Sequence, residues 1–326
     1  MILAGDIGGT KTYLGLFNVK DGRPELTGFG AFKNAEFGGY LEIIERFLEK
    51  EGRLADIEAA AFGVAGTIEG GRCSMTNIRW VIDAAEISAN FRIRKAGLLN
   101  DLAAAAWGVD LLSANDLFTL QKGNAGPGNA AVIAAGTGLG ESLLYWDGAS
   151  HIPLPSEAGH ADFAPRTRIE TELLEYLSGV YGHVSYERAL SGQGIENIHA
   201  FFKDRSGSQR HGTPLKRPPI EGAAAITEEA MNGTDEPCRN ALELFISLYG
   251  AESGNLALRA LASGGVYVGG GIAIKILPAL KKDGSFVDSF CGKGRLRGFL
   301  SRVPVHVILN DKIGLLGAGR YAARMP

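Results

Sequence analysis

Hydrophobic and polar positions alternate in blocks along the first third of the chain. Short apolar runs that predict strands occupy residues 1–6, 10–19, 23–32, 58–64 and 95–99. Side chains that recur every three or four residues predict an amphipathic helix and comprise Leu41, Ile44, Phe47 and Leu48. A second helix is expected over 102–107, directly after the strand at 95–99. Strands that alternate with helices indicate an α/β sheet.

The pattern restarts near the middle of the chain. An apolar run at 130–135, a glycine turn that contains a threonine, and a strand at 142–146 repeat the order of the opening hairpin, which predicts two related halves. The remaining expected elements are a helix over 169–177, a polar loop over 203–219, a helix over 241–261, a strand at 266–268, a helix from Ile272, a strand at 303–309 and a helix from Ile313. The last of these helices is expected to return to the first domain.

The length of 326 residues suits two domains. We expect a smaller α/β domain from residues 1–103 plus 310–326 and a larger one from 104–309. A cleft between two such domains is a natural ligand site. The 46 glycines are about twice the usual share, so many backbone positions turn sharply or approach a ligand closely.

Charge and cysteine content exclude several classes of partner. With 33 Lys+Arg against 36 Asp+Glu, the chain has no broad positive field for a nucleic acid or an anionic membrane. It contains no apolar run long enough to span a membrane, and we expect a cytoplasmic protein. Its three cysteines form no C-x-x-C pair, which favours buried thiols over a zinc or redox site.

The first candidate for ligand chemistry is the turn after the opening strand. Asp6 precedes Gly8, Gly9, Thr10 and Lys11, and the glycine amides can face a phosphate without hindrance. Asp6 could hold Mg²⁺ through water, because this cation prefers oxygen ligands. The alternative is a tight hairpin whose glycines only provide a positive φ.

Two further glycine segments could contact a nucleotide. Gly136, Thr137 and Gly138 offer a hydroxyl among free amides, but the following residues resemble a strand, so this segment is not a dinucleotide-binding fingerprint. The chain also lacks the G-x-x-x-x-G-K-[ST] motif of P-loop proteins. The run 269–271 (Gly269, Gly270, Gly271) at a strand-to-helix junction could border adenine or ribose, or could serve only close helix–sheet packing.

Polar residues at the ends of other apolar runs could bind and activate a hydroxylated substrate. Asp101, next to Asn100, is placed to accept a hydroxyl proton, although capping of the following helix is an alternative role. Glu157, His160 and Glu187 suit the hydroxyls of a polyhydroxylated ligand better than a transition metal. The segment 75–80, which contains Asn77, could cover the site or form a surface turn.

In their order and spacing these segments resemble the bacterial glucokinases of the hexokinase/actin-like ATPase superfamily. The resemblance covers nearly the whole chain. Its matching stretches are residues 5–10, 75–77, 100–101, 136–140, 157, 159–160, 162–165, 182–185, 187–188, 190–192, 254–258, 269–272 and 314–317.

This resemblance implies a two-domain actin-like ATPase (ribonuclease H-like) fold with an interdomain active-site cleft, and transfer of the γ-phosphoryl of ATP to the 6-hydroxyl of D-glucose. It implies that Asp101 is the general base and that sugar hydroxyls are held by Asn77, Asn100, Glu157, His160 and Glu187. It further implies Mg²⁺ at Asp6, phosphates at Gly8, Gly9, Thr10, Gly136, Thr137 and Gly138, and adenosine at Gly269, Gly270 and Gly271. Lys11 is not implied by the resemblance, but its positive charge could act on the phosphates beside this turn. Relatives of this kind suggest a homodimer.

The chain departs from the family pattern at a few positions near these residues. Lys11 stands where the family usually has Asn, and Ser156 and Ala158 replace glycines beside Glu157. The changes beside Glu157 affect the identity of the sugar more than the reaction. The alternatives are therefore a kinase of mannose, glucosamine or an N-acetylhexosamine, and a protein that binds sugar and nucleotide without turnover.

Overall fold

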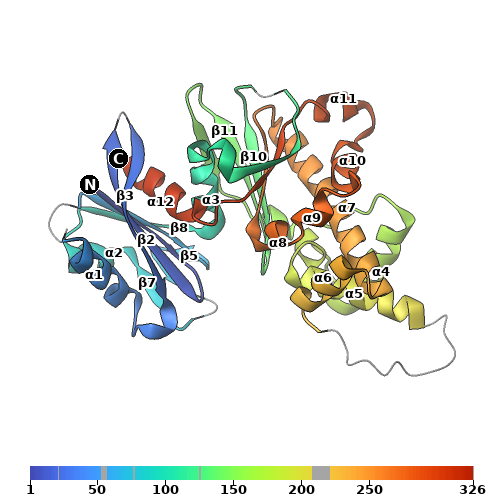
Figure 1. Cartoon of the computed structure of the whole chain (residues 1–326), viewed down its shortest axis with the longest axis horizontal. Helices are drawn as coiled ribbons and strands as arrows, with labels where there is room; N and C mark the ends of the chain where they lie inside the picture. Colours follow the sequence, from blue (N-terminus) through green and yellow to red (C-terminus); the bar gives the residue numbers. More distant parts are fainter. Residues whose placement is uncertain (21, 53–56, 76–77, 125, 208–220, 326) are drawn as a thin grey trace. The chain divides into compact units, whose positions relative to one another are not determined.

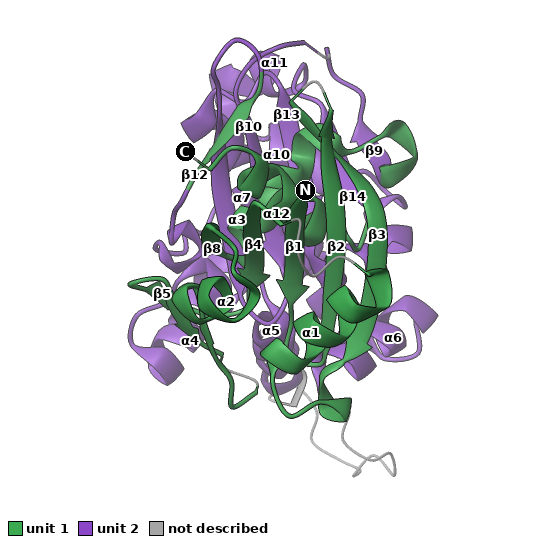
Figure 2. Ribbon diagram, turned by 90° about the vertical axis from the view of Figure 1, so that its left-hand side faces the viewer, with its two compact units in different colours: residues 1–116, 150–154, 310–326 green, residues 117–149, 155–309 purple. Residues whose placement is uncertain are grey.

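The structure is a computed structural model that describes residues 1–326 except 21, 53–56, 76–77, 125, 208–220 and 326. The chain folds into two compact units, coloured separately in Figure 2. Unit 1 comprises Met1–Asp116, Ser150–Leu154 and Asn310–Pro326, and unit 2 comprises Leu117–Ala149 and Pro155–Leu309. The expected boundary between residues 103 and 104 lies within a continuous helix, so the chain leaves unit 1 only after Asp116.

Unit 1 is built on a five-stranded sheet of order β3-β2-β1-β4-β8, in which all five strands are labelled in Figure 2 and the sheet is seen from another side in Figure 1. The strands are β1 (Ile2–Ile7), β2 (Lys11–Lys20), β3 (Arg23–Lys33), β4 (Ala59–Val64) and β8 (Lys95–Asn100). The hairpin β1–β2 is antiparallel, whereas β1–β4 and β4–β8 are parallel. The strands predicted for this part of the chain are confirmed.

Side chains alternate between the two faces of this sheet, as the twofold period of a strand requires. Leu3 and Ile7 pack with the apolar face of α1 (Tyr40–Glu51), while Ile2 and Ala4 pack with α12 (Ile313–Ala323). The remaining helices of unit 1 are α2 (Ala84–Phe91) and α3 (Asp101–Gly108). The predicted return of the last helix to the first domain is confirmed.

A small antiparallel sheet in unit 1 was not predicted from the hydrophobic pattern, because its strands are only two or three residues long. It consists of β5 (Ile68–Glu69), β6 (Arg72–Ser74) and β7 (Val81–Asp83). The strand β12 (His151–Leu154) also belongs to unit 1, where the backbone amide of His151 donates to Asp110 at 2.9 Å.

Four strands of unit 2 repeat the arrangement of four strands of unit 1. The strands of unit 2 run in the order β11-β10-β13-β14-β9, namely β9 (Leu117–Gln121), β10 (Ala130–Ala135), β11 (Leu139–Trp146), β13 (Gly265–Gly269) and β14 (Val305–Ile308). The hairpin β10–β11 is antiparallel, and β13 and β14 follow in parallel, as β4 and β8 do beside β1–β2. The topology therefore confirms the prediction of two related halves.

The longest helix of unit 2 is the buried α7 (Glu236–Ala260). The other helices described in this unit are α4 (Arg168–Tyr181), α5 (Gly192–Gly207), α6 (Ala223–Asn232), α8 (Gly270–Lys275), α9 (Leu277–Leu280), α10 (Ser285–Cys291) and α11 (Arg297–Leu300). Among them, α5, α6, α10 and α11 contact α7. The start of α7 is earlier than expected because Asp235 caps it. The loop expected over 203–219 is wrong for 203–207, which continue α5, and the rest lies outside the described residues.

Short 3₁₀ turns connect these elements at Asn34–Glu36, Val109–Leu111, Ala114–Asp116, Ala158–His160, Tyr186–Arg188 and Gly294–Leu296. Among the described residues, no helix combines the length and the apolar character that crossing a membrane would require. All three cysteines are buried, as expected.

Candidate active site

The first glycine turn joins β1 to β2 in unit 1. The amide of Gly8 donates to the carbonyl of Lys11 at 2.9 Å, and Thr10 and Lys11 are exposed. The tight hairpin is present, but neither Gly8 nor Gly9 has a positive φ, so a need for a positive φ does not explain these two glycines. The turn presents accessible polar groups, as a phosphate-binding turn requires.

A buried asparagine outside the predicted set holds this turn in place. Asn34 is 2% exposed and donates from its side chain to the carbonyl of Gly8 at 2.8 Å. Its backbone amide donates to the carbonyl of Thr10 at 3.0 Å, and its Oδ1 accepts from the Thr12 hydroxyl at 2.8 Å. The role of Asn34 could not be read from the sequence because its partners lie 22 to 26 positions away.

The residues Asn100 and Asp101 stand where β8 ends and α3 begins. The side chain of Asn100 accepts from the amide of Ala103 at 2.6 Å and so caps α3. Asp101 accepts only from the adjacent amide of Leu102, at 2.8 Å, among the hydrogen bonds of the described residues. The capping role considered for Asp101 therefore belongs to Asn100, and Asp101 is exposed.

The parallel pairing of β1, β4 and β8 brings Asp6 and Asp101 to the same edge of the sheet. Gly63, on the intervening strand β4, lies beside Asp6 and against α3, because a Cβ added there would meet Asp6 Oδ1 at 3.8 Å and Ala104 Cβ at 2.9 Å. Burial raises the pKa of Asp6 to about 7, and the charges of Asp101 and Asp311 add to this rise. Surrounding protein atoms also raise the pKa of Asp101, because they displace water from its carboxylate.

The third carboxylate of this cluster, Asp311, was not among the predicted site residues. It precedes α12 and accepts from the Tyr13 hydroxyl at 3.2 Å. Its position after an apolar strand was a signal in the sequence, but only the return of α12 to unit 1 brings it near Asp6. Asp6 could hold a hard divalent cation such as Mg²⁺ through water, and the charges of Asp101 and Asp311 would favour a cation there.

The second glycine turn, between β10 and β11 of unit 2, is tied to a predicted sugar-binding residue. Oε2 of Glu187 accepts from the amide of Leu139 at 2.9 Å, and a Cβ added at Gly138 would come within 2.4 Å of the same oxygen. Gly136 faces open space and Thr137 is exposed. The strand that follows this turn, β11, confirms that the turn is not a dinucleotide-binding fingerprint.

The other polar candidates of unit 2 gather beside this turn. Nδ1 of His160 lies 3.9 Å from Oε1 of Glu187. Both His160 and Glu157 are exposed, at the end and the start of one 3₁₀ turn. A Cβ at Gly159 would meet the carbonyl of Leu139 at 2.1 Å, so this glycine lets the 3₁₀ turn lie against β11. The hydroxyl of Ser156 donates to the carbonyl of Glu141 at 2.7 Å and anchors the same segment.

Glu141, on β11 just after the second turn, is a buried carboxylate that the sequence pattern did not single out. It is 1% exposed, and neither side-chain oxygen has a hydrogen-bond partner among the described residues. Arg259 lies 3.7 Å from its Oε2 and bonds to Glu252 at 2.6 Å. Burial, assisted by the charge of Glu252, raises the pKa of Glu141 to about 8.

The three glycines at the start of α8 differ in their surroundings: one packs tightly against the sheet, and the other two leave room for a ligand. Gly270 has a φ of +87°, and a Cβ there would meet the carbonyl of Ala135 at 2.2 Å. Close helix–sheet packing therefore explains Gly270. Gly271 faces open space, and a Cβ at Gly269 would make only ordinary contacts, which leaves both compatible with a ligand. The remaining candidate, Asn77, lies outside the described residues.

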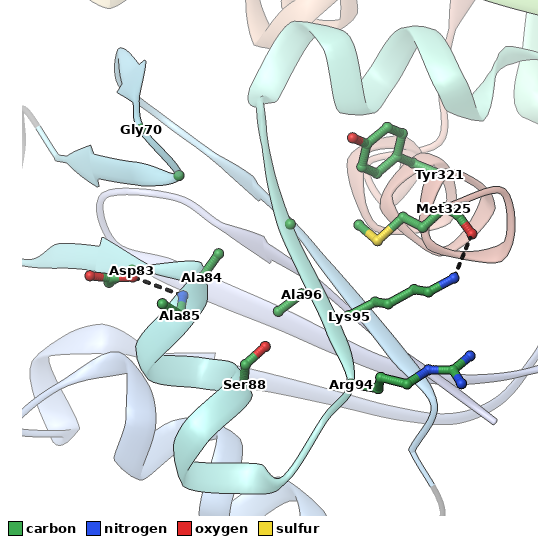
Figure 3. Close-up of a pocket in the computed structure, with 12 residues that line it drawn as sticks. Gly70, Asp83, Ala84, Ala85, Ser88, Arg94, Lys95, Ala96, Tyr321 and Met325 are labelled. Atoms are coloured by element: carbon green, nitrogen blue, oxygen red, sulfur yellow. Dashed lines mark hydrogen bonds between the residues drawn. The ribbon is translucent and has the colours of Figure 1, made fainter.

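Unit 1 contains a cavity of about 490 Å³ that is lined by its own residues (Figure 3). Arg94, Lys95, Tyr321 and Met325 contribute to its lining, and Lys95 donates to the carbonyl of Met325 at 3.4 Å. None of the described candidate residues lines it. The carboxylate cluster and the two glycine turns are therefore the better guide to chemistry.

Comparison with known proteins identifies the family of the chain. A family model described as Glucokinase matches residues 3–325. The glucokinase of Nostoc sp. (strain PCC 7120 / SAG 25.82 / UTEX 2576) is 40% identical, over 100% of this chain and 99% of its own. A crystal structure of a glucokinase from an Antarctic psychrotroph has a TM-score of 0.86 and 30% identity, and covers 99% of both chains.

A more distant structure supports the fold alone. The ROK family glucokinase of Streptomyces griseus, solved in complex with glucose and AMPPNP, has a TM-score of 0.62 at 22% identity and covers 99% of both chains. The expected two-domain α/β fold of the actin-like ATPases is confirmed. The chain belongs to the glucokinase family and is an ATP-dependent hexose kinase.

Proposed function

We propose that the chain transfers the γ-phosphoryl of ATP to the 6-hydroxyl of D-glucose, giving glucose 6-phosphate and ADP. The observation that carries this proposal is the placement of Asp101 at the end of β8, exposed and relieved of helix capping by Asn100. A raised pKa makes the Asp101 carboxylate a stronger base toward a hydroxyl. Family membership supplies the reaction class.

In this proposal Asp101 accepts the proton of the 6-hydroxyl as its oxygen attacks the γ-phosphorus. The bond between that phosphorus and the β,γ-bridging oxygen breaks, and ADP leaves. Phosphoryl transfer depends mainly on positioning and charge neutralisation, so a single base with accurate placement is sufficient protein chemistry. Asn100 would hold a sugar hydroxyl beside the base.

Unit 1 also carries the residues that suit Mg²⁺. Asp6 would hold the ion, directly or through water, with Asp101 and Asp311 adding negative charge nearby. When bound, Mg²⁺ neutralises the phosphate oxygens of ATP. The turn formed by Gly8, Gly9, Thr10 and Lys11 would contact phosphates through its backbone and its exposed side chains.

Unit 2 would supply the other contacts to substrates. Glu157, His160 and Glu187 are candidates for the sugar hydroxyls, since a site whose polar groups match each hydroxyl rejects analogues that lack one. Gly136, Thr137 and Gly138 would contact phosphate, and Gly269 and Gly271 would border the adenosine, while Gly270 lets α8 pack closely on the sheet beside them. Asn77 completes the proposed sugar contacts.

We further propose that the enzyme is cytoplasmic and homodimeric, with no nucleic-acid or membrane partner, and that its product enters glycolysis. The balanced charge of the chain supports small-molecule partners. Its membership of the glucokinase family supports the dimer. Light scattering of the purified chain at several concentrations tests the oligomeric state.

The experiment that tests the reaction is ADP release from Mg-ATP with and without glucose. We expect a strong glucose-dependent rate, lost in Asp101→Ala while glucose binding by calorimetry persists. Asp288→Asn, an exposed acidic position on α10, serves as the control and should keep full activity. Full activity in Asp101→Ala would contradict the proposed base.

A panel of sugars separates glucose from the alternatives. Mannose, glucosamine and N-acetylglucosamine are compared at equal concentration, and glucose is expected to give the highest kcat/KM. A higher value for another hexose would move the assignment to that sugar and leave the role of Asp101 intact.

A further inference from the structure

Three side chains of the types that bind transition metals meet in unit 2, apart from the candidate active site. They are His199 on α5, Asp235 at the N-cap of α7, and Cys238 in the first turn of α7. One ligand atom from each lies within 4.8 Å of the others. This juxtaposition was not foreseen, because His199 is 36 residues from Asp235 in the chain and the cysteines form no C-x-x-C motif.

Local structure explains how the two helices present these groups together. Oδ1 of Asp235 accepts from the amide of Cys238 at 2.9 Å, so the cap that starts α7 also places the carboxylate and the thiol at the same end of the helix. The second carboxylate oxygen remains available to a cation. α5 packs directly against α7 and carries His199 to the same place.

The burial of the three groups suits a metal site with a route to solvent. His199 is 7% exposed and Cys238 is fully buried, whereas Asp235 is half-buried. An ion could therefore enter past Asp235.

We propose that His199, Asp235 and Cys238 bind a divalent transition metal of the Zn²⁺ type. Imidazole nitrogen, carboxylate oxygen and thiolate sulfur are the ligands of zinc, and thiolate disfavours the hard cations Mg²⁺ and Ca²⁺. Loss of the thiol proton on binding gives the ligands two negative charges, which balance the cation. Three protein ligands leave one tetrahedral position for water. The metal links α5 to α7 and stabilises unit 2.

The test uses Co²⁺, whose bond to thiolate gives a near-ultraviolet charge-transfer band and whose tetrahedral sites absorb strongly in the visible. The full chain is stripped with a chelator and titrated with CoCl₂ without Mg²⁺ or nucleotide. We expect one Co²⁺ per chain to give both absorptions, whatever weakly absorbing Co²⁺ binds at Asp6, together with displacement by Zn²⁺ and a higher Tm with Zn²⁺. Absence of a thiolate band in the native chain would overturn the proposal.

Variants assign the ligands. Cys238→Ser and His199→Asn should abolish the bands, whereas Cys291→Ser, which changes a buried cysteine elsewhere in unit 2, should keep them. Asp235→Asn should fold, because asparagine is also a good helix cap. Its affinity for Co²⁺ should fall by about tenfold or more, because even residues that only hydrogen-bond to metal ligands contribute that much. Unchanged affinity in Asp235→Asn, or a band lost in Cys291→Ser and kept in Cys238→Ser, contradicts the proposed ligand set.

Discussion

Glu187 accepts a hydrogen bond from the backbone amide of Leu139, 2.9 Å away, at the point where the second glycine turn enters β11. Within unit 2, a carboxylate proposed to bind sugar is thus held by the segment proposed to bind phosphate. The geometry leaves no room for a side chain between them at Gly138. A change in one proposed contact is therefore expected to affect the other.

Gly138→Ala should lower kcat/KM for glucose by about 10-fold or more. The new Cβ would lie 2.4 Å from Oε2 of Glu187, so the carboxylate would have to move away from its position. Steady-state kinetics and the Tm are measured together. Gly179→Ala, at an exposed position of α4 with open space around it, is the matched control and should resemble the native chain. Native kinetics in Gly138→Ala would show that Glu187 does not need this position.

Asn34→Ala should raise the KM for ATP and lower the free energy of unfolding by about 1–3 kcal/mol, since it leaves the buried Thr12 hydroxyl and the Gly8 carbonyl without a partner. Kinetics at varied ATP and urea denaturation check the two effects. Asn18→Ala, at an exposed position on β2, is the control. If the stability falls while the KM for ATP stays native, Asn34 supports the fold but not the nucleotide site.

Gly270→Ala and Gly271→Ala separate packing from ligand access at the start of α8. The first requires a left-handed φ and a close contact with the Ala135 carbonyl, so it should destabilise the chain by more than about 2 kcal/mol. The second meets open space, so its Tm should be native while its KM for ATP rises. A native KM for ATP in Gly271→Ala would remove this residue from the proposed adenosine contact.

Glu141 should make the chain less stable as the pH rises. Its folded-state pKa of about 8 lies above the ordinary value of 4.5, so the folded chain keeps a proton that the unfolded chain has released between these pH values. The free energy of unfolding contributed by this group therefore falls from pH 4.5 to 8, by up to about 1.4 kcal/mol per pH unit.

Glu141→Gln removes that titration. The Tm of Glu141→Gln minus the Tm of the native chain should therefore be larger at about pH 9 than at about pH 6. Scanning calorimetry of both proteins across this pH range measures the difference. Glu228→Gln, at a position on α6, should show no such trend. A difference in Tm between native and Glu141→Gln that does not change with pH counts against a protonated Glu141.

Local patterns predicted the elements that depend on neighbouring residues. The hairpins around Gly8 and Gly136 could be predicted because apolar runs and turn residues are adjacent in the chain. The helix at Leu41 and Ile44 could be predicted from its spacing alone. The position of Asn100 and Asp101 at a strand end followed from the same apolar run that forms β8.

Features that depend on distant contacts could not be predicted in this way. Asn34 is an ordinary polar residue until β3 brings it beside the Gly8 turn, and Asp311 gains its role only when α12 packs on unit 1. The strand that carries Glu141 could be predicted, but the burial of its carboxylate near Arg259 depends on packing between distant segments. The meeting of His199 with Cys238 depends on how α5 packs against α7, which no spacing in the sequence encodes.

The return of α12 to unit 1 affects the order in which the chain can fold on the ribosome. Ile2 and Ala4 pack against Leu315 and Ala318, yet all of unit 2 is translated between them. The face of the unit 1 sheet that carries Ile2 and Ala4 therefore stays exposed to solvent while unit 2 is synthesised and folds. During this interval the exposed apolar face of the nascent chain can aggregate, until α12 has been synthesised and packs on it.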